Sequence, residues 1–149
     1  MSQDLADLLF PSSPRVEAIL AQYPARGLAQ GALVTRFAPS PTGFVHIGSI
    51  YIAMIDWLLA HLTGGVFILR IEDTDQKRQI ERALEDIVQY LAAFGLDPDE
   101  GLAIVDGAIA ERGAYGPYVQ SERRTIYGAF AKQLVASGWA YPSFQTEEE

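Results

Sequence analysis

The sequence predicts an α/β protein built on a parallel sheet, and three of its features support that class. Short apolar runs at residues 33–37 and 66–71 have the length of strands, and the second is apolar throughout, as in a strand covered on both faces. Each run precedes a segment with apolar residues at helical spacing, over about 47–62 and 77–94. This alternation is typical of parallel sheets with right-handed crossovers, so we expect a Rossmann-like arrangement.

The helix expected over 47–62 carries apolar residues on most of its circumference, so we predict that it is buried. Gly64 and Gly65 follow it in the manner of a helix C-terminus. After Gly95 the pattern loosens, and residues 97–117 are rich in glycine, aspartate and proline, which predicts a loop.

A last helix is expected over about 121–137, and Gly138 ends it. The apolar side chains that we expect on its inner face are Ile126, Tyr127, Phe130, Leu134 and Val135. Residues 139–141 then predict a short strand, and we expect both tryptophans, Trp57 and Trp139, in the core. Two short amphipathic segments separated by prolines indicate a surface-packed extension at the N-terminus. We therefore expect an extension at 1–31 and half of a Rossmann-like sheet domain from residue 32 to about residue 115.

Composition excludes several classes of function. The chain has 149 residues, 49% of them hydrophobic, which is enough for a core, and no cysteine, so disulfides and thiolate metal ligands are excluded. Its net charge of −8 is opposite to the footprint of most nucleic-acid-binding proteins. No basic leader is visible, and Asp56 interrupts the longest apolar stretch, so we expect a cytoplasmic protein without a membrane partner.

The stretch from Ala38 to Ser49 joins the first expected strand to the first long helix. A helix start offers free backbone N–H groups and the positive end of the helix dipole, which suits a phosphate. His46 adds a ring donor there, and Gly48 lets a base or ribose approach the backbone closely. His-x-Gly alone is a weak pattern, because a lone histidine at a helix start is more often a cap or a core residue.

Three blocks in order resemble the class I aminoacyl-tRNA synthetases and, more narrowly, the glutamyl-tRNA synthetases. They are Arg-Phe-Ala-Pro-Ser-Pro-Thr-Gly-x-x-His-Ile-Gly at 36–48, Ile-Glu-Asp-Thr-Asp at 71–75 and Gly-Pro-Tyr-Val-Gln-Ser-Glu-Arg at 116–123. The resemblance covers roughly residues 32–149. It implies the first half of a class I nucleotide-binding fold at 32–115, followed at 116–149 by the start of the inserted subdomain that holds the tRNA acceptor end. The implied activity of the full-length enzyme is the ATP-dependent attachment of glutamate to tRNA(Glu) through a glutamyl-adenylate.

In that reaction the amino-acid carboxylate attacks the α-phosphate of ATP, so the protein mainly positions the reactants and stabilises phosphate charge. The resemblance implies that His46 and Gly48 are catalytic and bind ATP, together with Thr42 and Gly43 of the same turn. Mg²⁺ would arrive with ATP, and we expect no metal held by the protein itself.

The resemblance also implies a glutamate site. The guanidinium of Arg36 would pair with a substrate carboxylate, and Glu72 would accept from the substrate ammonium. Ala38 would contribute backbone contacts and Ser40 a hydroxyl. Ser40 stands where glutaminyl enzymes usually carry an acidic residue, which favours L-glutamate as the substrate.

Two neighbouring clusters have alternative interpretations. Glu72, Asp73 and Asp75 could bind metal or act as acid and base, but such a cluster more often caps the next helix, a role that suits Thr74 and Asp75. A second set of side chains could contact tRNA phosphates or sugars or could simply begin a helix, with its serine as the N-cap. This set is Tyr118, Gln120, Ser121 and Arg123.

The C-terminal stretch indicates whether the protein binds zinc and whether the chain is part of a longer enzyme. Residues 141–145 carry serine and glutamine where some relatives bind zinc through cysteines, so we expect no zinc. Residues 146–149 have the Thr-x-x-Glu form of a capping box, which indicates the start of a further helix, although a solvated acidic tail is the alternative. We therefore expect the N-terminal part of a longer, monomeric enzyme, with this chain by itself inactive and prone to associate.

Two other functions remain open at this point. One is the shorter glutamyl-queuosine tRNA(Asp) synthetase, which the missing zinc cysteines and the N-terminal extension disfavour. The other is a non-catalytic paralogue that binds a nucleotide or tRNA without making adenylate.

Overall fold

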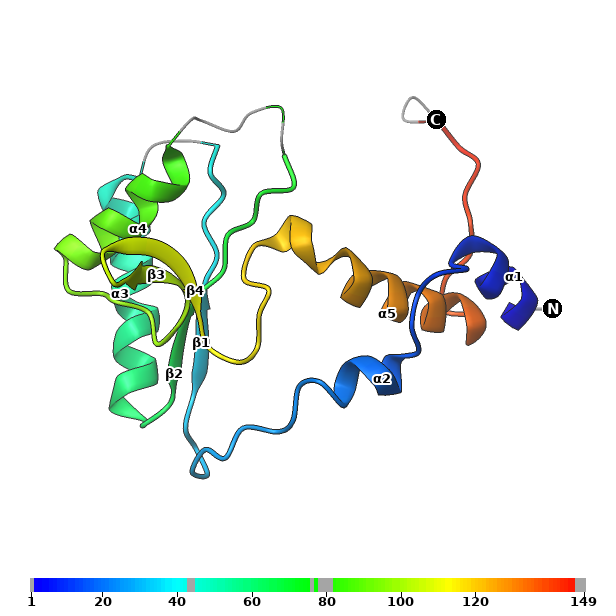
Figure 1. The fold of residues 1–149 in the computed structure, drawn as a ribbon, viewed down its shortest axis with the longest axis horizontal. Helices are drawn as coiled ribbons and strands as arrows, with labels where there is room; N and C mark the ends of the chain where they lie inside the picture. Colours follow the sequence, from blue (N-terminus) through cyan, green and yellow to red (C-terminus); the bar gives the residue numbers. More distant parts are fainter. Residues whose placement is uncertain (1, 43–44, 76, 78–81, 147–149) are drawn as a thin grey trace. The chain divides into compact units, whose positions relative to one another are not determined.

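The computed structural model describes residues 2–42, 45–75, 77 and 82–146 of the chain. Two compact units can be distinguished (Figure 1). The larger unit is Ala25–Arg123 and contains the sheet, whereas the smaller unit combines Met1–Pro24 with Arg124–Glu149. The N-terminal segment and the last helix therefore share one unit, although they lie at opposite ends of the sequence.

The sheet of the larger unit has four strands in the order β1-β2-β3-β4. Their bounds are β1 Val34–Phe37, β2 Val66–Leu69, β3 Glu100–Val105 and β4 Ala108–Arg112. Strands β1 and β2 are parallel, β2 and β3 are parallel, and β4 returns antiparallel to β3. The predicted α/β class with a mainly parallel sheet is confirmed.

Two helices make the crossovers between the parallel strands: α3 (Ile47–Leu62) and α4 (Ala83–Ala93). Both lie on the same face of the sheet, as right-handed crossovers in one direction require (Figure 1). The core lies between this face and the two helices. Its largest fully buried side chains are Phe67, Leu69, Ile71, Ile87 and Leu91.

Helix α3 begins and ends where the sequence predicts, but the prediction that it is buried is wrong. Only Ile50, Ala53 and Ala60 are buried along it. Ile47, Tyr51, Ile52 and Leu62 are 76%, 60%, 57% and 79% exposed. A helix packed on one face of a sheet covers only one stripe of its surface, so the remaining apolar positions face outward.

The loop predicted over 97–117 is also wrong in part, because β3 and β4 form a hairpin there. The register pairs Val105 with Ala108 and leaves Asp106 and Gly107 as the two turn residues. Their φ values are +50° and +82°, as expected for a turn whose two central residues are left-handed. Asp-Gly between two strands is a strong hairpin signal, and the abundance of glycine around it obscured that signal.

The helix predicted over 77–94 begins, in the described part of the chain, at Ala83. Residue 76 and residues 78–81, including Ile80, lie outside the described residues. Arg82 is the N-cap with φ +70°, a left-handed conformation that prevents α4 from extending further towards the N-terminus. Thr74 and Asp75 therefore do not cap α4, contrary to our expectation.

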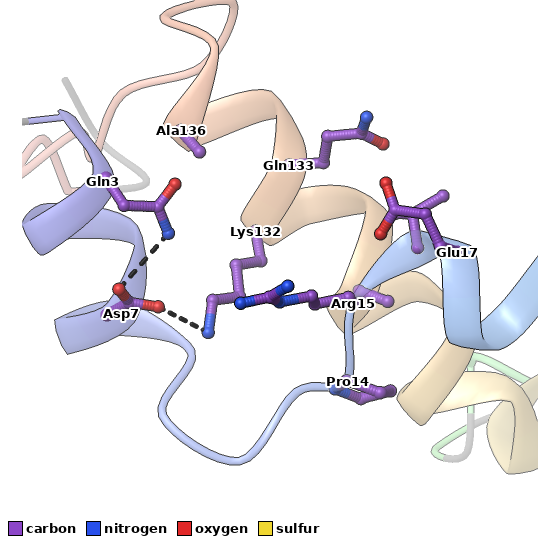
Figure 2. Close-up of a pocket in the computed structure, with 10 residues that line it drawn as sticks. Gln3, Asp7, Pro14, Arg15, Glu17, Lys132, Gln133 and Ala136 are labelled. Atoms are coloured by element: carbon purple, nitrogen blue, oxygen red, sulfur yellow. Dashed lines mark hydrogen bonds and ion pairs between the residues drawn. The ribbon is translucent and has the colours of Figure 1, made fainter.

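The smaller unit contains three helices in its described part: α1 (Ser2–Leu9), α2 (Val16–Leu20) and α5 (Arg124–Ala136). The two helices predicted before residue 31 are confirmed. Val16, Ile19 and Ala129 form the buried centre of this unit. A hollow of about 390 Å³ lies beside it, where Lys132 Nζ and Asp7 Oδ1 are 2.7 Å apart (Figure 2). No helix in the described part of the chain is long and apolar enough to cross a membrane.

The C-terminal predictions are confirmed only in part. The chain forms a short 3₁₀ helix, η2 (Gln120–Arg123), before α5. Val135 is buried and Ile126 packs inward, as predicted, but other apolar positions of α5 do not. Tyr127, Phe130 and Leu134 are 40%, 40% and 49% exposed.

Residues 139–141 do not form the predicted strand. The amides of Trp139 and Ala140 donate instead to Leu134 O, which closes the end of α5 after Gly138 with its φ of +79°. Trp139 is 84% exposed, so its predicted place in the core is wrong. Trp57 packs against the core as predicted. Residues 147–149 of the predicted capping box lie outside the described residues.

Candidate functional site

The residues predicted to bind glutamate and ATP lie near the carboxyl ends of β1 and β2. Arg36 is in β1 itself and Gly48 is in the first turn of α3, whereas the loops that follow the two strands carry Ala38, Ser40, Thr42, His46 and Glu72. Because these strands are parallel, the loops meet at one edge of the sheet. Two backbone hydrogen bonds join them: Arg70 N donates to Phe37 O at 3.1 Å, and Glu72 N donates to Pro39 O at 2.9 Å. The position of Glu72 relative to the first loop is therefore set by the backbone.

Arg36 and Glu72, both predicted as glutamate ligands, contact each other directly. Arg36 Nη1 lies 2.8 Å from Glu72 Oε1, and Arg70 Nη2 approaches the same oxygen at 3.4 Å. Sequence reasoning missed Arg70, although residues 70 and 72 share one side of an extended chain. The Nε atom of Arg70 is buried without a hydrogen-bond partner in the described part of the chain.

A hollow of about 270 Å³ lies at the same edge of the sheet, and Pro39, whose carbonyl accepts the hydrogen bond from Glu72 N, is one of the residues that line it. It brings together Ser40, Thr42 and His46, three residues that were predicted to bind glutamate or ATP. The other residues that line it are Phe37, Pro39, Val45, Ser49 and Ile87. The hollow thus reaches from the end of β1 to the first turn of α3.

His46 is the N-cap of α3 through its backbone, while its ring makes no cap hydrogen bond. The imidazole instead lines the hollow, where Nε2 is 3.4 Å from Ser49 Oγ. The alternative in which the ring of His46 caps the helix is therefore wrong. Its ring and the positive end of a 16-residue helix border the same space, which is a suitable environment for an anionic group.

Gly48 has a local reason for being glycine. A Cβ atom there would lie 3.0 Å from Nδ1 and 3.1 Å from Cε1 of the His46 ring. The missing side chain therefore makes room for the imidazole in its present position. Ala38 lies between Arg36 and Ser40 on the same loop and is partly exposed. Gly43 lies outside the described residues.

Residues 32–149 match the family described as "tRNA synthetases class I (E and Q), catalytic domain". This chain belongs to that family. The resemblance of the three sequence blocks to class I synthetases is thereby confirmed.

Individual class I relatives match over most of the chain. It is 50% identical over 148 residues to a glutamate–tRNA ligase of Clostridium perfringens strain 13, and 52% identical over 147 residues to that of Acetivibrio thermocellus. These matches cover 99% and 97% of this chain but only 27% and 26% of the relatives. The chain therefore spans about a quarter of the length of the curated relatives that it matches.

Solved class I structures agree in fold. The crystal structure of a glutamate tRNA ligase from Elizabethkingia meningosepticum in complex with its amino acid matches with a TM-score of 0.68 and 44% identity. A glutamate-tRNA synthetase from Elizabethkingia anophelis matches with a TM-score of 0.67 and 43% identity. Each match covers 78% of this chain and 22% of the solved one.

Within this class I chain, Tyr118 has a structural role. Tyr118 is 2% exposed. Its hydroxyl donates to Glu100 at 2.9 Å and accepts from the amide of Tyr115 at 3.0 Å. Burial, together with the hydrogen bond to Glu100, raises the pKa of Tyr118 to about 12. Arg26 pairs with the same carboxylate and lies over the ring of Tyr115, 3.8 Å from its centroid. The Tyr118 side chain is therefore not accessible to a nucleic acid in this structure.

The neighbouring positions of η2 are tied to the end of β2. Ser121 does not cap α5; its amide and hydroxyl both donate to the carboxylate of Asp73, at 2.8 and 2.6 Å. Gln120 N donates to Ile71 O at 2.9 Å. Arg123 Nη1 donates to Pro117 O at 2.6 Å. The prediction of Ser121 as the N-cap of a helix is wrong.

Two carboxylates of the acidic cluster after β2 turn to different partners. The carboxylate of Glu72 faces two arginines and that of Asp73 faces Ser121, so the two point to different partners. Within the part of the chain that the structure describes, no group of three or more histidines, aspartates and glutamates is arranged to hold a metal ion.

Proposed function

We propose that this chain provides the amino-acid and ATP sites of an enzyme that attaches glutamate to tRNA(Glu) through a glutamyl-adenylate. The observation that carries the proposal is the ion pair of Arg36 and Glu72 at the carboxyl ends of β1 and β2, the edge of the sheet at which the hollow lined by Phe37 and His46 also begins. Relatives that match nearly the whole chain are named glutamate–tRNA ligases, which supports the same reaction.

The charges of the site complement those of glutamate. A free glutamate carries two carboxylates and one ammonium group, and the site offers the guanidinium groups of Arg36 and Arg70 with the carboxylate of Glu72 between them. An arginine binds a carboxylate through two parallel charged hydrogen bonds, which a neutral amide cannot match. Arg36 therefore favours glutamate over glutamine, and the uncharged hydroxyl of Ser40 adds no repulsion.

ATP would bind along the hollow at the start of α3. The ring of His46, the hydroxyl of Thr42 and the first turn of α3 would receive its phosphates, with Gly48 leaving space for the ring. We keep Gly43 as a further ATP-binding residue. Mg²⁺ would enter bound to ATP, where it neutralises phosphate charge.

The chemical step needs little more than this arrangement. The glutamate carboxylate attacks the α-phosphate and pyrophosphate leaves, so no side-chain nucleophile is required. Arg36 and Glu72 would hold the amino acid in line, and His46 would stabilise the charge that builds on the phosphate oxygens.

For tRNA we propose a smaller contribution from this chain. Gln120 and Arg123 lie on η2, directly before α5, and residues 116–149 would begin the subdomain that receives the acceptor end. We further propose that the full-length enzyme acts in the cytoplasm as a monomer.

The test is the ATP–pyrophosphate exchange and aminoacylation activity of the full-length protein. We expect exchange with glutamate and tRNA(Glu) present, and far less with glutamine. Exchange with glutamine, transfer of glutamate to tRNA(Asp) instead of tRNA(Glu), or nucleotide binding without any exchange would each contradict the proposal.

A further inference from the structure

The chain that follows β2 is held from both sides. On one side Arg70 and Glu72 donate to the carbonyls of Phe37 and Pro39, as described above. On the other side Ile71 N donates to Tyr118 O at 2.9 Å. Residues 70–72 thus continue the strand beyond Leu69, between the loop after β1 and the segment before η2.

The partner on this second side changes along β2. Strand β3 pairs with β2 only as far as Leu69, which lies opposite Gly101. Beyond that point a parallel bridge joins Ile71 to Val119, and Gln120 N donates to Ile71 O. The segment before η2 therefore takes the place of β3 at the edge of the sheet where the site lies.

Asp73 completes this second connection with its side chain. Ser121 N donates to Oδ1 at 2.8 Å and Ser121 Oγ donates to Oδ2 at 2.6 Å, so each carboxylate oxygen receives one donor. The two residues are 48 positions apart in the sequence, and the contact is partly buried. Hydrogen bonds to an ionised carboxylate are stronger than those between neutral groups, so this contact holds the backbone at Asp73 firmly.

Successive side chains of an extended segment point to opposite sides. Glu72 accordingly faces Arg36 while Asp73 faces Ser121. Fixing one of these side chains therefore fixes the backbone that orients the other.

We propose that Asp73 is a positioning residue for amino-acid binding. The two hydrogen bonds from Ser121 to the Asp73 carboxylate fix the backbone conformation between residues 72 and 73. They thereby keep the carboxylate of Glu72 between Arg36 and Arg70. The inference rests on the proposed function, in which Glu72 receives the ammonium of glutamate. It assigns Ser121 to the amino-acid site rather than to direct tRNA contact.

The experiment uses the full-length protein with three single variants and one control. Asp73→Asn keeps the size of the side chain but removes its charge, Ser121→Ala removes the hydroxyl, and Ser121→Thr restores it. Ser137→Ala is the matched control, because among the described residues its hydroxyl donates only to carbonyls of the preceding helix α5, at 2.8 Å from Gln133 O and 3.2 Å from Leu134 O. KM values for glutamate, ATP and tRNA(Glu) are measured separately, together with the thermal unfolding midpoint.

We expect Asp73→Asn to raise the KM for glutamate roughly tenfold, the factor that corresponds to one hydrogen bond to a charged group. Ser121→Ala should raise it roughly fivefold, because the backbone donor remains. Both should leave the KM values for ATP and tRNA within about twofold of the wild type. Ser121→Thr and Ser137→Ala should match the wild type. The double variant Asp73→Asn with Ser121→Ala should have a KM for glutamate no higher than that of Asp73→Asn alone, because both substitutions weaken the same contact between the two side chains.

Several outcomes would overturn the inference. A rise in the KM for tRNA alone in Ser121→Ala would make Ser121 a nucleic-acid contact. Equal rises in all three KM values, with a lower unfolding midpoint, would make the contact merely structural. Additive effects in the double variant would show that the two residues act separately. A wild-type protein that charges tRNA(Glu), with Asp73→Asn unchanged, would refute this inference alone, whereas a wild-type protein that cannot use glutamate would refute the proposed function and this inference with it.

Discussion

Arg36 Nη1 and Glu72 Oε1 lie 2.8 Å apart, although the two residues are separated by 36 positions in the sequence. Their side chains are 40% and 33% exposed, and a pair this exposed contributes at most about 1 kcal/mol to stability. The pair is thus a minor element of stability. Under the proposed function, the two charges lie side by side to receive a ligand that carries both signs.

Replacing Arg36 tests this interpretation. Arg36→Ala in the full-length protein should raise the KM for glutamate at least roughly tenfold, because it removes charged hydrogen bonds to a substrate carboxylate. Steady-state kinetics with separate titrations of glutamate and ATP would measure it. Arg15→Ala, at an exposed arginine of the smaller unit, is the matched control. An unchanged kcat/KM for glutamate would remove Arg36 from the site.

The two histidines of the chain allow a second comparison. His46→Ala should lower the rate of pyrophosphate exchange roughly 100-fold, because a preorganised donor to the reacting phosphate is lost. His61 instead stacks on Trp57 with ring centroids 4.2 Å apart, and its Nδ1 lies 2.8 Å from Trp57 O. His61→Ala should therefore lower stability by about 1 kcal/mol and leave the exchange rate unchanged. Equal loss of activity in both variants would contradict a specific role for His46.

Gly65 tests the close approach of two backbones at the start of the sheet. A Cβ atom there would lie 1.8 Å from Leu33 O, so Gly65→Ala must move the start of β1 away from β2. We expect a loss of at least about 2 kcal/mol in the free energy of unfolding, as for an overpacked interior. Gly27→Ala is the control, because its Cβ would meet nothing within 4 Å.

The control should stabilise the protein by up to about 1 kcal/mol, since alanine restricts the unfolded chain. Urea unfolding of both variants would decide the matter. A Gly65→Ala protein as stable as the wild type would mean that β1 and β2 approach each other less closely than described.

Glu100 predicts an acid-sensitive contribution to stability. The hydrogen bond from Arg26 lowers the pKa of Glu100 below its usual 4.5, against the opposing effect of burial, and the Tyr118 hydroxyl lowers it further. A lowered pKa in the folded state gives stability that is present above pH 4.5 and is lost as the pH falls through the folded pKa. Glu100→Gln should cost about 2 kcal/mol at neutral pH and weaken this acid dependence. Urea unfolding of the wild type and of Glu100→Gln, measured from neutral to acid pH, would check this. If the free energy of unfolding fell with pH equally in both proteins, Glu100 would not be responsible for the acid dependence.

Tyr118 predicts the opposite behaviour at alkaline pH. Burial raises the pKa of Tyr118 from 10 to about 12, so the unfolded chain loses this proton first. Stability should therefore fall as the pH rises from 10 towards 12. Tyr118→Phe should remove this dependence of stability on pH. In an absorbance titration of the tyrosines, the variant should lack the phenolate signal that the wild type gains at the highest pH. A wild-type phenolate signal that is complete near the ordinary tyrosine pKa would contradict the burial of Tyr118.

Several elements could be predicted from local sequence because their signals are local. Apolar runs defined β1 and β2, and helical spacing followed by Gly64 defined α3 to its last residue. The sequence analysis does not predict the hairpin of β3 and β4, although Asp106-Gly107 marks its turn, because the surrounding residues are rich in glycine and aspartate and are equally typical of a loop. The exposure of α3 and of Trp139 could not be predicted, since the apolar character of a residue does not indicate which other part of the protein, if any, packs against it.

The sequence by itself determined the family and the residue types that the chemistry needs: a histidine and a glycine at a helix start, and an arginine and a glutamate after two strands. Only the tertiary structure decided how they are paired. Arg36 meets Glu72 and Asp73 meets Ser121 because β1, β2 and the segment before η2 lie side by side in one register at one edge of the sheet. Such contacts join residues far apart along the chain, so their geometry depends on how the strands align and not on any local pattern.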